Sequence, residues 1–347
     1  MKKWRFGIVG AGLIARFHAM AIGALESAEV AGFCDSGSGR ARDLVGEFGG
    51  RVFADYKELA ASEGVDVVAI ATPSGFHAEP AIEAARCGKH VICEKPLEVT
   101  LERIDMMIAA ARDNEVLLGG IFQNRFTNAM MPLRAALRQG RFGKVTYAGA
   151  YVPWWRREEY YKDSWHGTWA LDGGGAMMNQ SIHMIDMLCD LMGPVRSVCG
   201  FVGRPGHPEI EAEDTGVAAL EFASGAMGVI YGTTGSWPGR GKRFEVTGTD
   251  GTAVFLEDSF VVWKFRQETA EDEQVRQRFR MSRDKGGAAD PGAIDFENHR
   301  RNFAAFLEAL EGGGDFEISG AEARKAVEVI LAIYRSARER RVVELGG

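Results

Sequence analysis

The sequence is poor in cysteine and lacks the pairing that a disulfide framework or a zinc site requires. Its 347 residues include five cysteines, at positions 34, 87, 93, 189 and 199, with no Cys-x-x-Cys pair. An odd and scattered set fits reduced thiols in a reducing compartment. Cys34 and Cys93 each end an apolar run, so we interpret them as buried structural thiols.

Long apolar runs and an excess of basic residues are also missing. No segment approaches the roughly 18 apolar residues that span a bilayer, and the apolar stretch near the start is too short for a signal peptide. The formal net charge of −7 argues against a surface for nucleic acid or an anionic membrane. The remaining composition is that of a globular protein, which we expect in the cytoplasm without nucleic-acid or membrane partners.

What the N-terminal third does contain is a regular alternation of short apolar runs and helical patterns. Strands alternating with helices imply right-handed crossovers and a parallel sheet. We therefore predict an α/β domain with a doubly wound parallel sheet, a Rossmann fold, over residues 1–122. Its strands are predicted at residues 5–9, 30–34, 51–53, 65–71, 90–93 and 116–119.

The turn after the first predicted strand carries a glycine pattern with a physical function. Gly10 allows the tight turn from strand to helix, and Gly12 lets the backbone approach a pyrophosphate. The helix that follows, through Leu13 and Ile14, presents free N–H groups and a partial positive charge to that phosphate. Because the pattern follows a strand and opens a helix, it predicts dinucleotide binding.

An acidic residue at the end of the second predicted strand indicates which dinucleotide is bound. Asp35 lies where a carboxylate accepts hydrogen bonds from the adenosine ribose, and it would repel a 2′-phosphate. Arg40 and Arg42 follow it and can neutralise such a phosphate instead. NAD is the predicted cofactor, with NADP as the alternative.

Three stretches carry a more specific signature. Residues 71–77 read Ala-Thr-Pro-Ser-Gly-Phe-His, and residues 88–97 read Gly-Lys-His-Val-Ile-Cys-Glu-Lys-Pro-Leu. Residues 173–186 begin with three glycines and include Asn179 and His183. These stretches resemble the Gfo/Idh/MocA family, which includes glucose–fructose oxidoreductase, inositol dehydrogenase and many sugar dehydrogenases. The resemblance spans the first domain and the start of the second.

The resemblance implies a reaction. It implies an NAD(P)-dependent oxidoreductase that transfers a hydride between nicotinamide and a secondary hydroxyl or ketone of a sugar, sugar acid or cyclitol. The alternative is an NAD-dependent glycosidase or lyase of the same fold, which oxidises a sugar carbon transiently with no net redox change. Beyond the glycine turn, Asp35 and Arg40, the cofactor contacts that it implies are Ala71, Thr72, Pro73, His77, Glu94, Lys95, Gln123 and Trp169.

Lys95 is the predicted catalytic residue of the first domain. It directly follows a predicted buried strand, at the carboxyl end of a parallel sheet, where such folds bind ligands. In the family the matching lysine lies near the nicotinamide and the reacting oxygen, so the resemblance also makes Lys95 a substrate contact. His77 is open between capping the helix that starts there and contacting the cofactor.

From about residue 123 the pattern changes to many strands joined by short turns. Ser224-Gly225 and Asp250-Gly251 are hairpin signals. We predict an α+β domain over residues 123–347 with a large, mostly antiparallel open sheet, closed by two helices. Residues 267–292 are predicted as a long loop or extension. The resemblance implies a homodimer or homotetramer formed through the sheet.

A predicted helix over residues 176–192 carries the polar candidates of this domain. Asn179, His183, Asp186 and Asp190 are spaced to share one face. The matching histidine of the family handles the substrate hydroxyl proton, so the resemblance makes His183 a catalytic and substrate-binding residue, and Asn179 is predicted to share both functions. Many relatives have aspartate in place of Asn179, and an amide cannot ionise. The proton acceptor is therefore open between His183 and Lys95, and no metal is predicted, because no third ligand joins His183 and Asp186.

Two further segments complete the predicted site. Residues 123–126 resemble the family segment that lines the cofactor and substrate cleft, where Arg125 either holds the hinge or contacts substrate. Trp165 and Trp169 follow the family pattern Trp-x-Gly-x-Trp, which makes Trp165 a substrate contact and Trp169 a cofactor contact. The alternative is that this aromatic loop packs against the sheet or a partner subunit.

Overall fold

The computed structural model describes residues 3–280 and 296–346. The chain divides into two compact units, which we describe separately. Unit 1 consists of Met1–Gln123, Ala170–Gly173 and Asp295–Val327, and unit 2 consists of Asn124–Trp169, Gly174–Ile294 and Glu328–Gly347. Unit 1 therefore takes in a C-terminal segment that lies far beyond residue 122 in the sequence.

Unit 1 contains a six-stranded parallel sheet in the order β3-β2-β1-β4-β5-β6. The predicted doubly wound sheet is confirmed, and its order reverses between β1 and β4, the switch point at which such sheets bind ligands. The strands are β1 (Trp4–Val9), β2 (Ala28–Cys34), β3 (Arg51–Val52), β4 (Val67–Ile70), β5 (His90–Cys93) and β6 (Leu118–Gly120).

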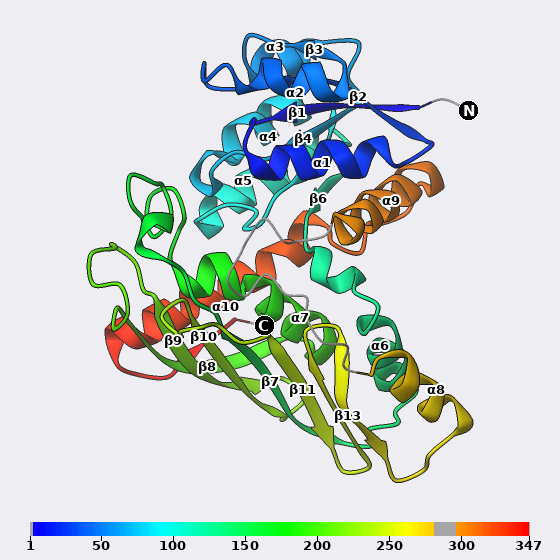
Figure 1. Ribbon diagram of the computed structural model, residues 1–347, viewed down its shortest axis with the longest axis vertical. Helices are drawn as coiled ribbons and strands as arrows, with labels where there is room; N and C mark the ends of the chain where they lie inside the picture. Colours follow the sequence, from blue (N-terminus) through cyan, green and yellow to red (C-terminus); the bar gives the residue numbers. More distant parts are fainter. Residues whose placement is uncertain (1–2, 281–295, 347) are drawn as a thin grey trace. The chain divides into compact units, whose positions relative to one another are not determined.

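Helices connect these strands, and a helix from the far end of the chain joins them. Helix α9 lies beside α1 in Figure 1, where it is coloured orange. The ring of Phe303 on α9 meets Phe6 of β1 edge to face, with 5.7 Å between centroids, which brings the C-terminal segment into the core of unit 1. The helices are α1 (Leu13–Gly23), α2 (Arg40–Phe48), α3 (Tyr56–Ala61), η1 (Ser74–Phe76), α4 (Ala78–Arg86), α5 (Leu101–Asp113) and α9 (Glu297–Gly312).

Unit 2 contains an eight-stranded sheet in the order β13-β12-β11-β7-β10-β9-β8-β14. The pairing of β7 with β10 is parallel and the other pairings are antiparallel, so the predicted mostly antiparallel sheet is confirmed. The strands are β7 (Val145–Pro153), β8 (Val195–Gly203), β9 (Thr215–Phe222), β10 (Met227–Thr233), β11 (Arg243–Gly248), β12 (Gly251–Leu256), β13 (Ser259–Phe265) and β14 (Val343–Glu344).

The helices of unit 2 include one segment of unusual winding. Residues Ala176–Ser181 form a π-helix, labelled η4, that runs directly into α7 (Ile182–Met192). The long helix α10 (Gly320–Glu339) begins in unit 1 and ends in unit 2. The other helical segments are η2 (Gln123–Phe126), α6 (Met130–Arg138), η3 (Glu158–Tyr160) and α8 (Ala270–Arg278).

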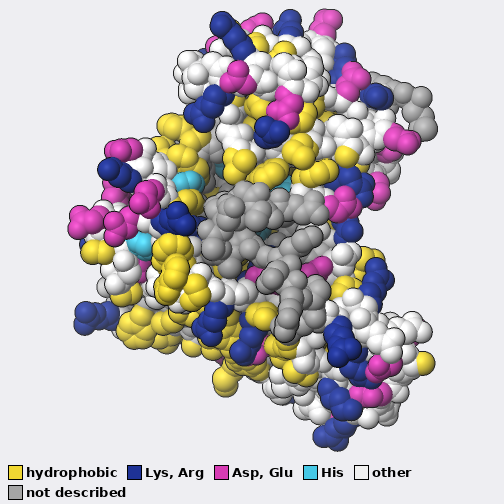
Figure 2. Space-filling view, in the orientation of Figure 1, with side chains coloured by type: hydrophobic (Ala, Val, Ile, Leu, Met, Phe, Trp, Pro, Cys, Tyr) yellow, Lys and Arg dark blue, Asp and Glu magenta, His cyan; other side chains and the backbone are white. Residues whose placement is uncertain are grey.

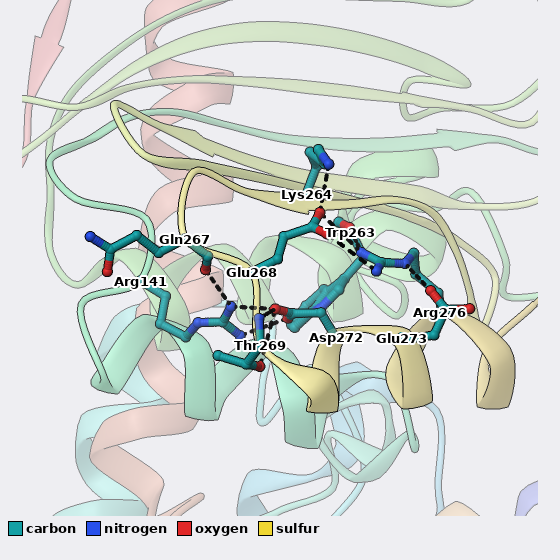
Figure 3. Close-up of polar contacts among 9 residues, drawn as sticks. All are labelled: Arg141, Trp263, Lys264, Gln267, Glu268, Thr269, Asp272, Glu273 and Arg276. Carbon is teal, nitrogen blue, oxygen red and sulfur yellow. Dashed lines mark hydrogen bonds and ion pairs between the residues drawn. The ribbon is translucent and has the colours of Figure 1, made fainter.

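Helix α8 corrects the predicted loop over residues 267–292. Thr269 and Asp272 form a capping box at its start, and the carboxylate of Asp272 also accepts bonds from Arg141 and from the indole of Trp263 (Figure 3). These contacts hold a strongly polar helix against β13, although its own sequence pattern gives no apolar face. Residues 281–292 of the predicted loop lie outside the described part of the chain.

No helix among residues 3–280 and 296–346 is both long and apolar enough to cross a membrane. Figure 2 shows Lys and Arg side chains interspersed with Asp and Glu over the visible face, as the modest net charge of −7 leads one to expect.

Candidate functional site

The turn between β1 and α1 requires glycine at position 10. Gly10 has φ +107°, and a Cβ there would lie 2.5 Å from the carbonyl oxygen of Ala71. Its N–H donates to the carbonyl of Cys34 at 2.9 Å. The turn therefore joins the carboxyl ends of β1, β2 and β4, which brings the predicted residues Ala71 and Thr72 beside the glycine turn.

Gly12 differs from Gly10 because there is space for a side chain at Gly12 and none at Gly10. It is the N-cap residue of α1 and supplies no side-chain cap, and a Cβ there would meet no atom within 4 Å. Leu13, the first residue of the helix, is 52% exposed, and Ile14 is half-buried. An open backbone surface at a helix N-terminus fits the pyrophosphate of a dinucleotide.

Asp35 follows β2 and holds a fixed negative charge at this edge of the sheet. Its carboxylate accepts hydrogen bonds from the N–H of Gly37 at 2.7 Å and of Ala41 at 2.9 Å, and from the hydroxyl of Ser38 at 2.9 Å. Burial raises the pKa of Asp35, but these hydrogen bonds outweigh it and lower the pKa overall. Arg40 is exposed and donates to the Ser38 hydroxyl at 3.3 Å, so it lies next to this loop.

Lys95 lies two residues after the end of β5 and is half-buried. The side chain of the preceding Glu94 turns back so that its Oε2 accepts the N–H of Lys95 at 3.0 Å. The Lys95–Pro96 peptide bond is cis. Glu94 itself is 6% exposed, so the backbone of Lys95 is held by a carboxylate that lies inside unit 1.

His77 connects the first two signature stretches. Its Nδ1 lies 2.9 Å from the carbonyl oxygen of Pro96, and its Nε2 lies 3.0 Å from that of Thr72. Burial lowers the pKa of His77, against the opposing effect of these two carbonyls. His77 is the N-cap residue of α4, but its side chain makes no cap bond to that helix. The side chain instead holds the loop after Lys95 against the loop after β4, and its contact with the cofactor stays a prediction.

The helix predicted over residues 176–192 begins as the π-helix η4, which changes the position of its side chains. Asn179 lies in η4 and His183 in α7, so the four-residue spacing between them does not follow α-helical geometry throughout. Asn179 is half-buried and its Nδ2 lies 3.4 Å from Nδ1 of His166, while His183 is 9% exposed. π-helical turns are frequent at functional sites.

Arg125 lies in η2 and contacts the same helix. Its guanidinium donates to Asp186 through two bonds, of 2.7 and 2.6 Å, and to Asp190 at 3.1 Å. Arg125 is 3% exposed and Asp186 is 1% exposed, so the pair is buried. Of the two alternatives for Arg125, these contacts favour a holding function, and its contact with substrate stays a prediction. Gln123, also buried, is the last residue of unit 1 before this segment.

Glu213 anchors the start of the π-helix, and the sequence reasoning missed it. Its Oε2 accepts the N–H of Gly175 at 3.0 Å, and its Oε1 accepts the N–H of Met177 at 2.8 Å and the hydroxyl of Tyr334 at 2.9 Å. Burial raises the pKa of Glu213 to about 7, although all three donors favour the ionised form. No local motif signals this residue, because its partners lie at least 36 positions away in the sequence.

The aromatic side chains of the loop lie around His166. The ring of His166 stacks on Tyr160 at 4.2 Å and lies 4.0 Å from Trp165. Trp169 is 46% exposed, and its ring meets Tyr334 edge to face at 5.3 Å. Trp165 and Asn179 are therefore neighbours of the same histidine, which places two predicted substrate contacts of unit 2 close together.

One cluster within the described residues has the geometry to hold a metal ion. The ligand atoms of His18, Glu94 and His299 lie within 4.8 Å of one another, and all three residues are buried. His183 and Asp186, for which the sequence offered no third ligand, do not belong to it. The absence of a metal stays a prediction.

The sheet order, the glycine turn and Asp35 together define unit 1 as a dinucleotide-binding domain, and comparison with known proteins specifies the family. A model of an oxidoreductase family with an NAD-binding Rossmann fold matches residues 4–121. A model of the GFO/IDH/MocA C-terminal domain matches residues 130–254. The chain belongs to the Gfo/Idh/MocA family of oxidoreductases, as its motifs predicted.

Individual relatives match over most of the chain. The structure is similar to that of the WlbA dehydrogenase from Bordetella pertussis in complex with NADH and UDP-GlcNAcA, with 32% identity, a TM-score of 0.90, and coverage of 100% of this chain and 99% of that one. Myo-inositol 2-dehydrogenase of Thermotoga maritima is 27% identical over 98% of both chains. Levoglucosan dehydrogenase of Pseudarthrobacter phenanthrenivorans is 27% identical over 74% of both.

Proposed function

We propose that this protein is an NAD-dependent dehydrogenase that acts on a secondary hydroxyl or ketone of a sugar, sugar acid or cyclitol. The relatives named above act on an inositol, on levoglucosan or bind a nucleotide sugar acid with NADH, and these share ring carbons that bear secondary hydroxyls. The observation that carries the proposal lies in unit 1. There Gly10, Asp35 and Lys95 all follow strands of one parallel sheet, at its carboxyl edge.

The residues of unit 1 fit the dinucleotide. The open backbone at Gly12 and the start of α1 would hold the pyrophosphate, with Ala71, Thr72 and Pro73 beside the same turn. Bound NAD supplies the hydride acceptor at its nicotinamide ring. The ionised Asp35 has acceptor capacity beyond its three internal bonds for the ribose hydroxyls. Its charge favours NAD over NADP.

The proposed chemistry divides between two residues. Lys95, with its backbone fixed by Glu94, polarises the reacting oxygen and stabilises negative charge that develops on it. His183 accepts the hydroxyl proton, and Asn179 orients the hydroxyl, since an amide can donate and accept but cannot ionise. Trp165 contributes a flat ring for the apolar face of a sugar.

The decisive experiment measures NADH absorbance with a panel of UDP-GlcNAcA, levoglucosan and myo-inositol. Lys95→Ala should lower kcat by about a thousandfold, because one preorganised stabiliser of developing charge contributes about that much. Lys57→Ala, an exposed lysine on α3, is the matched control and should keep wild-type turnover. Full turnover by Lys95→Ala would refute the assignment of Lys95. Glycoside cleavage without added cofactor would favour the glycosidase alternative.

Cofactor choice has a separate test at Asp35. Asp35→Ser removes the fixed charge that would oppose a 2′-phosphate, so the ratio of NADP to NAD efficiency should rise by about tenfold or more. Arg40 would then be the nearest cation to the phosphate. An unchanged ratio would show that Asp35 does not select the cofactor.

We also propose that unit 2 self-associates through the outer face of its sheet. Phe201 on β8 is 70% exposed and Met227 on β10 is 68% exposed, and Val217 on β9 is paired with Phe201. Hydrophobic side chains gather over these strands in Figure 2. Apolar patches of this kind mark interfaces. Sedimentation should show a dimer or tetramer that Phe201→Glu dissociates, and a wild-type monomer at micromolar concentration would refute the proposal.

A further inference from the structure

Three buried side chains from distant parts of the sequence lie close together, and one of them belongs to the residue before Lys95. His18 lies in α1, Glu94 follows β5 and His299 lies in α9, all within unit 1. Their exposed fractions are 0%, 6% and 1%. Nε2 of His18 donates to Oε1 of Glu94 at 2.9 Å, and Nε2 of His299 lies 3.8 Å from the same oxygen.

The two oxygens of Glu94 face in different directions. Oε1 faces the two histidines, whereas Oε2 accepts the backbone N–H of Lys95 at 3.0 Å. A carboxylate bonded on one side only can rotate about its side-chain torsions, whereas one bonded at both oxygens cannot do so without losing a bond. The bond from His18 therefore fixes the oxygen that holds Lys95.

The ionised state of Glu94 makes this arrangement strong. Burial raises the pKa of Glu94, but His18, His299 and Lys95 outweigh it and lower the pKa to about 2. Hydrogen bonds to a charged acceptor are roughly twice as strong as neutral ones. The backbone of Lys95 is therefore held by a charge-assisted bond to a largely buried carboxylate.

His18 also belongs to the helix that begins at the proposed phosphate site. Helix α1 starts at Leu13, after Gly12, and His18 lies in its second turn. A rigid helix thus links the dinucleotide turn at one end to Glu94 and the Lys95 backbone further along. The ring of Phe303 packs edge to face on His18 at 5.2 Å and limits its movement.

We propose that His18 and Glu94 are positioning residues for Lys95, which tie the backbone of this lysine to the helix that binds the cofactor phosphate. The proposal deepens the proposed function and rests on it, because it gives a purpose to the placement of Lys95. His299 supports the same oxygen of Glu94 from α9. None of the three touches the reacting atoms in this account.

The test compares His18→Leu, which removes the donor, with His18→Gln, whose side-chain amide can still donate to Glu94. The first measurement is hydrogen exchange of the Lys95 amide. His18→Leu should speed it by about tenfold, the effect of losing one hydrogen bond, and His18→Gln by under about threefold. His90→Asn is the matched control, since His90 is a histidine at the other end of β5 whose Nδ1 accepts the N–H of Leu117.

The second measurement is turnover with UDP-GlcNAcA, levoglucosan or myo-inositol, whichever the wild-type protein oxidises fastest. His18→Leu should lower kcat by about tenfold to a hundredfold with KM unchanged within twofold, because Lys95 is misplaced while binding persists. His18→Gln should recover most of kcat. A merely structural histidine would lower stability in both variants without this split between kcat and KM.

The outcomes separate the two levels of the proposal. If Lys95→Ala loses turnover but His18→Leu changes neither amide exchange nor kcat, the positioning proposal fails and the proposed function stands. If Lys95→Ala keeps full turnover, the catalytic assignment of Lys95 in the proposed function fails, whatever His18 does. Stoichiometric zinc in the purified protein that His18→Leu abolishes would also overturn the proposal, since the three ligand atoms would then hold a metal.

Discussion

In each unit a buried carboxylate bonds to the backbone next to the candidate residues, and the pKa values of the two carboxylates are shifted in opposite directions. Glu94 in unit 1 fixes the backbone before Lys95, and Glu213 in unit 2 fixes the backbone before Asn179. They are 6% and 2% exposed. Yet the pKa of Glu94 is lowered to about 2, whereas that of Glu213 is raised to about 7.

The partners explain the difference. Burial raises the pKa of both groups, because the charged form loses its hydration. Glu94 accepts a hydrogen bond from His18, and this bond, together with the electrostatic influence of His18, His299 and Lys95, outweighs burial. Glu213 accepts bonds from two backbone N–H groups and a phenol, which carry no net charge and do not outweigh it. For Glu213, three hydrogen bonds from uncharged donors therefore lower the pKa by less than burial raises it.

The largest expected effect on stability concerns a third buried carboxylate, that of Asp272. It shows whether the charged partner or the location in one of the two units determines the direction of the pKa shift. Asp272 lies in unit 2 but faces Arg141, whose hydrogen bonds lower its pKa well below the usual range (Figure 3). Asp272→Asn leaves that guanidinium without its counter-charge, so the free energy of unfolding should fall by about 3 kcal/mol. Urea denaturation at pH 7 measures it.

The control for this prediction lies one residue away. Glu273 is exposed and pairs with Arg276 at 3.0 Å, so Glu273→Gln should change stability by under about 1 kcal/mol. Equal losses for the two variants would show that a buried cation partner adds nothing, and the explanation for Glu94 would fail with it.

The second prediction is a pH dependence of opposite sign for the two carboxylates. The folded pKa of Glu213 is raised, so its contribution to stability is present below pH 4.5 and is lost as the pH rises through 7. The folded pKa of Glu94 is lowered, so its contribution is present above pH 4.5 and is lost as the pH falls towards 2. Each change amounts to about 3 kcal/mol in unfolding free energy.

Two variants separate these contributions. Glu213→Gln should flatten the decline between pH 5 and pH 8 and leave the acid limb, and Glu94→Gln should do the reverse. Unfolding free energies from urea titrations at half-unit pH steps measure both. A Glu213→Gln protein whose stability still declines from pH 5 to pH 8 by the wild-type amount would contradict the raised pKa of Glu213.

The difference between local patterns and contacts across the sequence explains what could be predicted. Gly10, Gly12, Asp35 and Lys95 each follow a strand, so their positions at the sheet edge depend on local pattern and on the parallel topology that this pattern implies. The sheets of both units were predicted for the same reason. The residues of this half of the candidate site could be predicted to lie at one edge of the sheet because the fold brings strand ends together.

The remaining contacts join residues that lie far apart in the sequence, so no local spacing predicts them. Glu213 meets Tyr334 across 121 positions and His18 meets Glu94 across 76. Helix α8 was missed because Asp272 and Arg141, 131 positions apart, stabilise it in place of an apolar face. The shared face drawn for Asn179 and His183 assumed 3.6 residues per turn, and the π-helix alters that geometry.

The third prediction removes one neutral donor from Glu213. Tyr334→Phe deletes the hydroxyl that donates at 2.9 Å but keeps the ring against which Trp169 packs. The loss should be about 1 kcal/mol, the net value of one hydrogen bond, and the pKa of Glu213 should rise further. Thermal denaturation at pH 6 and pH 8 measures both. Tyr334→Leu, which also removes the ring, should lose more. A Tyr334→Phe protein as stable as the wild type would show that the hydroxyl contributes nothing.

The smallest effect on stability is expected at Gly12. The structure leaves space for a side chain at this glycine of unit 1, whereas it leaves none at Gly175 of unit 2. A Cβ at Gly12 meets nothing within 4 Å, whereas one at Gly175 would fall on the carbonyl of Glu213. Gly12→Ala should therefore change unfolding free energy by under about 0.5 kcal/mol, while Gly175→Ala should be strongly destabilising. The methyl group would nevertheless lie where the pyrophosphate approaches the backbone, so the dissociation constant for NADH should rise by about tenfold or more. Fluorescence titration with NADH and a urea melt on the same sample measure the two quantities, and a Gly12→Ala protein with wild-type NADH affinity would place the dinucleotide away from this turn.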